Sequence, residues 1–212
     1  MRSYLFVPGE SPRDTAADAL VLDLTATPGS REAAGRWLDD HRAWVCVHAG
    51  GEAAADLRAV ARPGLEGVCV PRARSASDIA ALGTILAEAE DAAGLPLGTV
   101  PVLPRIETAA GVLAAAEIAR APRVSRLYLD DELLRAELGV VAGPDEAEVL
   151  WARSAVVLAG AAAGIAQPVG GVCAYPDLLR ASTRNLRRLG FGGRVCTDEQ
   201  QVALVNEAFA SA

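Results

Sequence analysis

The most constraining feature of this sequence is an eightfold alternation of short apolar runs with Ala-rich amphipathic segments. The apolar runs are rich in Val and Leu, which is typical of strands buried on both faces of a parallel sheet. They fall at about 2–7, 19–25, 44–48, 67–71, 100–106, 126–130, 170–175 and 193–197. This pattern predicts an α/β fold in which eight parallel strands close into a TIM (β/α)8 barrel, with a doubly wound open sheet as the alternative.

Helices are predicted between these runs, where apolar side chains recur at helical spacing. The predicted segments are 30–40, 52–61, 75–93, 108–120, 144–163, 175–190 and 198–210. Between the first two strands, the stretch 11–18 has room only for a shortened first helix. Because 212 residues suit one barrel, residues 1–212 are predicted to form a single domain.

The basic residues are all arginines, and the 20 of them stand against 27 acidic residues for a net charge of -7. Without lysine, the chain has no side chain for a Schiff base with a carbonyl substrate and no P-loop lysine. No basic block could follow a nucleic-acid backbone, and no glycine-rich dinucleotide motif follows the first strand. Neither a nucleic-acid partner nor a nucleotide cofactor is therefore expected. Carboxylates and arginines must carry most of the chemistry, because His41 and His48 are the only histidines.

The cysteines Cys46, Cys69, Cys173 and Cys196 each lie singly in an apolar run. We predict free, buried thiols within or at the ends of strands, which fits a reducing compartment. No apolar run reaches the roughly 18 residues that a membrane span needs, and the N-terminus lacks a secretory pattern. A cytoplasmic protein without a membrane partner is predicted.

Candidate functional residues lie where the strands run into the following loops, since such barrels place their chemistry there. They are Pro8 and Gly9, Thr25, His48, Arg72 and Arg74, Arg105 and Glu107, the acidic run 130–132, Gln167, Thr197 and Asp198. Glu107 and the acidic run follow neighbouring strands and supply oxygen ligands suited to Mg²⁺. The three arginines could bind a carboxylate or phosphate through forked hydrogen bonds. The alternatives are acids that cap the next helix and a solvated rim of arginines.

An ordered set of motifs along nearly the whole chain resembles the citrate lyase β-subunit group of the HpcH/HpaI aldolase/citrate lyase superfamily. The motifs are "RSYLFVPGESPR", "ADALVLDL", "GVCVPRARSASDI", "PRIETAAGVLAAAEIA", "LLRAELGV" and "LGFGGRVCTDEQQVALVNEAF". The resemblance implies an Mg²⁺-dependent barrel that cleaves or forms carbon–carbon bonds in a hydroxy or oxo acid or its acyl thioester. The metal would stabilise the enolate as a Lewis acid. It also implies a homo-oligomer, a trimer or hexamer.

The resemblance carries over to the site residues only in part. Glu107 stands at the family's first metal ligand, but the second ligand position is Leu133, next to Glu132. Thr25 and Ala26 replace two acids of the family motif "LDLED". The family motif "VRIN" is here "VCVH", and this places Cys46 at the arginine that grips the substrate carboxylate. The late motif "IHPxQ" has become "TDEQQ", which keeps only the glutamine at 201.

These motifs leave three functional classes open: a lyase with a shifted metal site, a lyase-derived binding or accessory subunit, and a structural subunit of an assembly. The predicted metal ligands are Glu107 with Glu132 or Asp131, and the predicted catalytic residues are Arg72 and Arg105. Substrate binding is assigned to Pro8, Gly9, His48 and Arg74. The chain ends directly after the eighth helix, where many relatives continue into a covering segment. Since an uncovered site excludes water poorly, we expect weak Mg²⁺ binding and reduced or altered activity.

Overall fold

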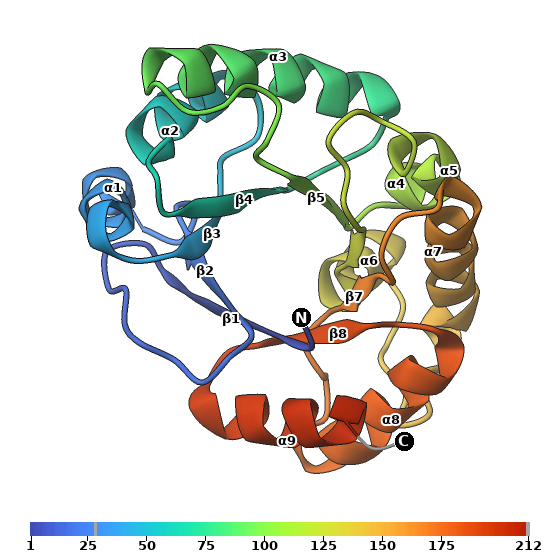
Figure 1. Ribbon diagram of the computed structural model, residues 1–212. Coiled ribbons are helices and arrows are strands. Elements are labelled where there is room, and N and C mark those ends of the chain that lie inside the picture. Colours follow the sequence, from blue (N-terminus) through green and yellow to red (C-terminus); the bar gives the residue numbers. More distant parts are fainter. Residues whose placement is uncertain (28, 211–212) are drawn as a thin grey trace.

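Eight parallel strands form a closed barrel in a computed structural model of the protein, which describes residues 1–27 and 29–210 (Figure 1). The strands are β1 Ser3–Pro8, β2 Ala19–Asp23, β3 Ala43–Cys46, β4 Leu65–Val70, β5 Val102–Ile106, β6 Tyr128–Leu129, β7 Val169–Gly170 and β8 Gly193–Cys196. Each strand pairs with the next along the chain, and β8 pairs with β1. The barrel predicted from the apolar runs is confirmed, and the open sheet is excluded.

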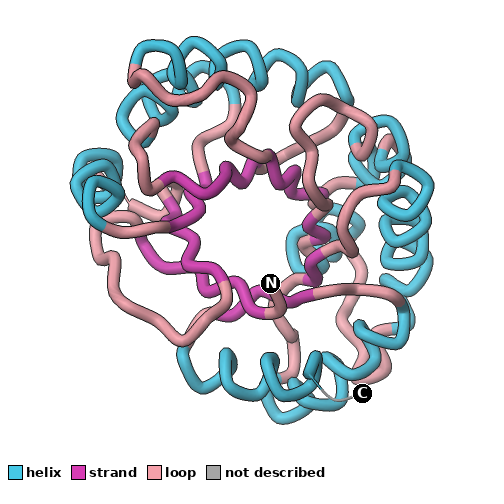
Figure 2. Tube along the Cα trace, viewed as in Figure 1, coloured by secondary structure: helices cyan, strands magenta, loops and turns pink. Residues whose placement is uncertain are grey.

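Helices form a ring around the barrel (Figure 2). They are α1 Ser30–Asp40, α2 Ala53–Val60, α3 Ala76–Ala92, α4 Ala109–Leu113, α5 Ala115–Ile118, α6 Asp131–Leu138, α7 Leu150–Ala163, α8 Leu179–Leu189 and α9 Glu199–Ala210, with short 3-10 turns η1 Gly50–Glu52, η2 Ala147–Val149 and η3 Pro176–Leu178. Among the described residues, no helix has both the length and the apolarity to cross a membrane.

The structure differs from the predicted helices in three places. The stretch from Gly9 to Asp18 is turn and loop without a helix, so the first helix is lost rather than shortened. The predicted helix 108–120 is divided at Ala114 into α4 and α5. Helix α6 was not predicted, although Asp130 caps its first turn by accepting a hydrogen bond from the Leu133 amide and Gly139 ends it with a left-handed φ of 66°.

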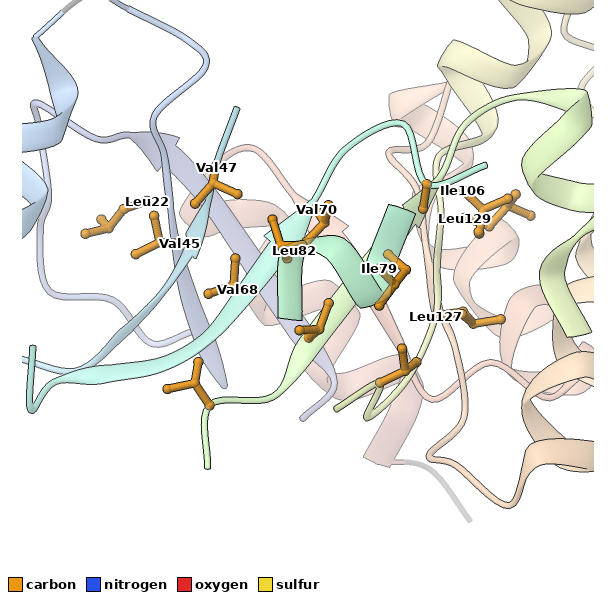
Figure 3. Close-up of a cluster of buried hydrophobic side chains, with 14 of the residues drawn as sticks. Leu22, Val45, Val47, Val68, Val70, Ile79, Leu82, Ile106, Leu127 and Leu129 are labelled. Carbon is orange, nitrogen blue, oxygen red and sulfur yellow. The ribbon is translucent and has the colours of Figure 1, made fainter. Parts of the chain in front are cut away.

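The outer core lies between the strands and the helices. Successive side chains of a strand point to opposite faces, so every second residue of each strand faces the helix layer. Figure 3 shows Val68 and Val70 of β4 near Ile79 and Leu82 of α3, and all four side chains are buried. This apolar layer holds α3 against the barrel wall. Because side chains alternate along each strand, the residues between them, such as Cys69 of β4, face the barrel interior.

The inner core fills the middle of the barrel, which the ribbon alone draws as an open ring. It is made of Tyr4, Ala19, Val21, Trp44, Cys46, Cys69, Leu103, Tyr128, Val169 and Val195. The Trp44 indole fits because β4 has a glycine beside it: a Cβ on Gly67 would lie 2.3 Å from the ring. The barrel interior is therefore a packed core, and ligands have access only at its ends.

The cysteines follow the predicted pattern at three of four positions. Cys46, Cys69 and Cys196 are buried in β3, β4 and β8, and all four thiols are free. The placement of Cys173 in a strand was wrong, because β7 ends at Gly170 and Cys173 lies in the following loop, partly exposed. Strands β6 and β7 have only two residues each, so the apolar runs there continue into loops.

Candidate functional site

The carboxyl ends of the strands form a mouth that is lined by polar side chains above the inner core. Period-2 alternation continues the inward face of β2, β5 and β6 from Val21, Leu103 and Tyr128 to the next inward positions. These are Asp23, Arg105 and Asp130. Cys46 pairs with Asp23 and Cys69 pairs with Cys46 across neighbouring strands, so these buried thiols lie beside the charged groups at the floor of the mouth.

Arg105 and Glu107 are the central charged pair of the mouth. They stand two residues apart on the inward face of β5 and its extension, and Arg105 Nε donates a hydrogen bond to Glu107 Oε2. Arg72 Nε lies 3.9 Å from the other carboxylate oxygen, Oε1. Burial lowers the pKa of Arg105, but the neighbouring negative charge, which includes the Glu107 carboxylate, outweighs burial and holds that pKa above its ordinary value. Glu107 is thus already bound by guanidinium groups.

Arg72 has a strained backbone at the edge of the mouth. Its φ is 55°, in the left-handed region that non-glycine residues rarely adopt, and its side chain is 75% exposed. The next amide, of Ala73, donates to the carbonyl of Arg105 across 3.2 Å, which ties this turn to β5. Such strain costs on the order of 1–3 kcal/mol and occurs often at functional sites, which is consistent with a functional Arg72.

The acidic run after β6 is divided by the barrel wall. Asp130 faces inward, where its Oδ2 accepts a hydrogen bond from the Tyr128 hydroxyl at 3.0 Å. Burial and the Asp130 charge raise the pKa of Tyr128 well above its ordinary value, so this hydroxyl stays protonated. Glu132 is exposed on the first turn of α6. The capping alternative from the sequence is confirmed for Asp130.

Asp131 points instead into the layer between the strands and the helices. Arg153 of α7 donates to its Oδ2 at 2.6 Å and to Glu146 at 2.8 Å. Ser182 of α8 also donates to Glu146, and Arg194 of β8 donates to Ser182, both at 2.8 Å. Burial raises the pKa of Asp131, and Arg153 opposes this rise. Asp131 of α6 is thus paired with Arg153 of α7, and Glu146 links Arg153 to Ser182 of α8. The Asp131 side chain does not reach the mouth.

His48 lies at the mouth in a pair that the sequence did not reveal. Its ring Nδ1 lies 2.9 Å from Asp56 Oδ2, and its backbone N–H donates to the same oxygen at 2.7 Å. Asp56 is on α2 with its side chain fully buried, and Arg31 of α1 donates to its Oδ1 at 2.5 Å. The sequence did contain one signal for this pair: Asp56 lies at helical spacing with Ala53 and Val60, on the face of α2 that is buried.

Three adjoining cavities share His48 in their walls. The first, of about 320 Å³, is lined by Thr25, His48, Ala49, Glu52, Pro71, Arg72 and Arg105. A second, of about 440 Å³, adds the predicted residue Arg74 on the β4 side. A third, of about 580 Å³, extends over α1 to Arg31 and Asp56. His48 and Arg72 thus line two of these cavities, the first together with Arg105 and the second together with Arg74.

Gln167 was wrongly predicted at the mouth: it precedes β7 and lies at the amino-terminal end of the strands, beside Gly192. Other predicted residues at the mouth have local structural contacts. Pro8 ends β1 and is exposed, and Gly9 donates its N–H to the Asp23 carbonyl at 3.0 Å. A Cβ on Gly9 would lie 2.9 Å from both Leu24 and Ser30, so the close approach of these segments requires glycine. Thr25 donates its hydroxyl to Asp23 Oδ1 at 2.7 Å.

The donor set does not meet the needs of a resident Mg²⁺. That ion prefers octahedral oxygen geometry with one or two free carboxylates. Glu107 is bound by Arg105, Asp130 by a tyrosine hydroxyl and a backbone amide, and Asp131 by Arg153. Over residues 1–27 and 29–210, no three His, Cys, Asp or Glu side chains are grouped closely enough to hold a metal ion.

A closed parallel barrel with a helix layer around it and charged side chains at the carboxyl ends of its strands defines the TIM-barrel class of fold. The sequence matches the HpcH/HpaI aldolase/citrate lyase family over residues 2–198, so the chain belongs to that family. It is 35% identical to a citrate lyase subunit beta-like protein of Deinococcus radiodurans over 99% of this chain and 80% of that relative. It is also 28% identical to a (3S)-malyl-CoA thioesterase of Cereibacter sphaeroides over 99% of this chain and 77% of that relative.

Solved structures of similar proteins share the fold. The citrate lyase beta subunit of Mycobacterium tuberculosis, complexed with oxaloacetate and magnesium, has a TM-score of 0.79 and 28% identity. The alignment covers 99% of this chain and 96% of that one. Another structure of the same organism's protein holds magnesium, acetoacetate and coenzyme A, again with a TM-score of 0.79 and 28% identity over 100% of this chain and 81% of that one.

Proposed function

We propose that this protein binds a small oxo or hydroxy acid, or its acyl thioester, at the barrel mouth, with weak Mg²⁺ binding and reduced or altered carbon–carbon lyase activity. The observation that carries the proposal is the charge arrangement around Arg105. Its guanidinium shares a cavity with Arg72, while Glu107, at the family's metal position, is bound to both. A ligand carboxylate suits these guanidinium groups, because Arg offers a planar fork of donors.

The relatives support this class of ligand. A similar structure holds oxaloacetate with magnesium, and another holds acetoacetate with coenzyme A. In this chain Arg105 takes over the task of the arginine that Cys46 replaces. The pKa of the Cys46 thiol is raised by its hydrogen bond with Cys69 and by burial, so Cys46 remains an uncharged part of the mouth floor.

Magnesium binding would use Glu107 with Asp130, because their strands are neighbours and Ile106 pairs with Leu129 one residue before each acid. Asp130 thereby replaces Asp131 and Glu132 in the proposed metal set. Arg105 and Arg72 pair with Glu107, and the Tyr128 hydroxyl and the Leu133 amide donate to Asp130, so these partners compete with an ion for the carboxylate oxygens. This competition is the reason for weak binding, and we derive no reaction step through the metal.

A second candidate function is a binding or accessory subunit without turnover. The observation that favours it is Leu133, which stands at the family's second metal position and is 43% exposed on α6. An apolar side chain supplies no ligand there. Ligand binding without any product would select this candidate over the lyase.

Calorimetry with Mg²⁺, together with an assay on malyl and citryl thioesters, tests the proposal. We expect a magnesium dissociation constant of about 1 mM or weaker, and little carbon–carbon cleavage. Glu107→Ala should remove the residual heat of binding, whereas the control Glu132→Ala, which changes an exposed residue of α6, should leave it unchanged. Tight binding that Glu107→Ala abolishes, combined with rapid cleavage of a thioester, would show that the site is a fully active lyase.

A further inference from the structure

We propose that His48 and Asp56 form a general-base pair that hydrolyses an acyl thioester whose acyl group carries a free carboxylate. The inference rests on the proposed function, since it uses the same ligand class and the same mouth. It names two residues with separate tasks for a thioester hydrolysis, the kind of reaction named in the similar (3S)-malyl-CoA thioesterase. His48 is the catalytic residue that acts on water, and Asp56 is the positioning residue behind it.

The hydrogen bonds of His48 determine which ring nitrogen is basic. An ionised carboxylate has only acceptors, so the contact of 2.9 Å between Nδ1 and Asp56 Oδ2 requires the proton on Nδ1. In the neutral ring the lone pair then lies on Nε2. The second bond to that oxygen, from the His48 backbone N–H at 2.7 Å, fixes the carboxylate relative to the ring.

Asp56 is held more firmly than a surface acid. Its side chain has no exposed area, and Arg31 contributes an ion pair at 2.5 Å through Nε. The His48 side chain, in contrast, is 35% exposed. A buried acid behind a partly exposed imidazole is the arrangement in which a third group orients a base for proton transfer.

The cavity in front of His48 provides the two other groups that thioester hydrolysis needs: a binding site for the ligand carboxylate and a cation near the thioester carbonyl oxygen. Arg72 and Arg105 line it together with His48, so a carboxylate can bind beside the base. When water attacks a thioester, the carbonyl oxygen becomes negative, and an arginine can stabilise that charge. Carbon–carbon cleavage would instead generate an enolate, and its stabilisation would call on Glu107, which is already paired with Arg105. The assembled groups therefore favour hydrolysis.

The proposed step is balanced without any further reactant. The oxygen of water attacks the thioester carbonyl carbon, and a proton of that water passes to Nε2 of His48. The tetrahedral intermediate then collapses, the C–S bond breaks, and the same proton moves from His48 to the leaving sulfur. The products are a carboxylic acid and a thiol, and nothing is oxidised or reduced.

The test measures coenzyme A released from malyl-CoA by chromatography. Release of the free thiol separates hydrolysis from carbon–carbon cleavage, which leaves the thioester intact on the fragment that carries coenzyme A. We expect His48→Asn to lower kcat by roughly 100- to 10,000-fold with little change in KM, as for loss of a general base. Added imidazole should restore part of the activity of His48→Ala, which a purely structural role would not allow.

The chain offers a matched control in its other histidine. His41 stacks on Trp37 with 3.8 Å between ring centroids and does not line the cavity shared by Arg72 and Arg105, so His41→Asn should leave hydrolysis unchanged. Asp56→Asn should lower kcat without weakening ligand binding. Since Asp56 is buried, this variant could fail to fold, in which case the two His48 variants decide.

Calorimetry with oxaloacetate on the same proteins keeps this inference separate from the proposed function. Oxaloacetate that binds wild type and His48→Asn equally, without coenzyme A release by the wild type, overturns the inference alone. The same holds if His48→Asn hydrolyses malyl-CoA as fast as the wild type. If oxaloacetate and malyl-CoA both fail to bind, the proposed function fails and the inference falls with it.

Discussion

At the scale of single residues, the mouth shows how neighbours in sequence take different tasks. Asp130 and Asp131 are adjacent, yet one faces the barrel interior beside Tyr128 and the other faces Arg153 in the helix layer. The cause is the start of α6 directly after the strand: Asp130 is the N-cap and continues the inward face of β6, whereas Asp131 is the first helical residue. Two of the three acids expected as a metal cluster are thereby separated from Glu107.

Gly67 leaves space in the barrel interior for the Trp44 indole because it has no side chain. A Cβ there would lie 2.3 Å from Cζ3 of Trp44, and the ring is enclosed by the inner core. We expect Gly67→Ala to lower the unfolding free energy by about 1–3 kcal/mol, because overpacking forces the indole from its place. Gly51→Ala is the control: nothing lies within 4 Å of its Cβ position, so chemical denaturation should show a change within about 0.5 kcal/mol. Equal effects of the two substitutions would contradict this account.

At the scale of elements, one acid joins three segments at the amino-terminal side of β5. Glu90, near the end of α3, accepts hydrogen bonds from the amides of Gly98 and Val100 at 2.8 and 3.0 Å. Arg123 binds both of its carboxylate oxygens at 2.8 Å. Burial raises the pKa of Glu90, but these hydrogen bonds outweigh it and hold the pKa below its ordinary value. The loop before β5 is therefore anchored by a charged group.

This anchor predicts a pH-dependent contribution to stability. A folded-state pKa below the unfolded value of about 4.5 means that the contribution is present above that pH and is lost as the pH falls through the folded value. Glu90→Gln should lower the unfolding free energy by about 3 kcal/mol at pH 7, and the difference from wild type should shrink below pH 4.5. Denaturant titrations at pH 7 and pH 3.5 measure it. Glu88→Gln, an exposed neighbour on α3, should have no such effect, and a difference that stays constant with pH would rule out the anchor.

At the scale of the whole molecule, apolar side chains remain exposed on one side of the helix ring. Leu113 of α4 is 76% exposed, and Trp151 and Leu158 of α7 are 66% and 70% exposed. Figure 1 shows α4, α5 and α7 gathered on that side. The described chain itself leaves these apolar side chains uncovered, whereas an interface between copies would bury them.

We expect the protein to form a homotrimer through this surface. Burying such side chains removes apolar area from water, which stabilises association. At a protein concentration on the order of tens of micromolar, a stable interface should be populated, so light scattering should give a mass above that of one chain. Trp151→Glu should shift the population toward monomer, because a charge would be desolvated in the interface. The exposed Leu97 lies in the loop after α3, so Leu97→Glu is the control. A monomeric wild type would contradict this expectation.

The sequence by itself determined the barrel and the level at which polar residues gather. Eight apolar runs of strand length, separated by helical patterns, are local signals, and one register of each strand buries its apolar face. The same reasoning placed His48, Arg72 and Arg105 at the mouth, because each follows or ends a strand. The absence of lysine in the sequence likewise excludes a Schiff base on a lysine side chain.

Only the tertiary structure decided which of these residues interact. Asp56 reaches His48 because α2 turns its buried face toward the end of β3, and Arg31 completes the contact from α1, 25 residues away in sequence. Strand β6 proved to be two residues long, so the side of the wall on which each acid of the run lies depended on where α6 begins. Local periodicity specifies the face of an element, whereas the partner across that face depends on how separate elements pack, and this is a property of the folded chain.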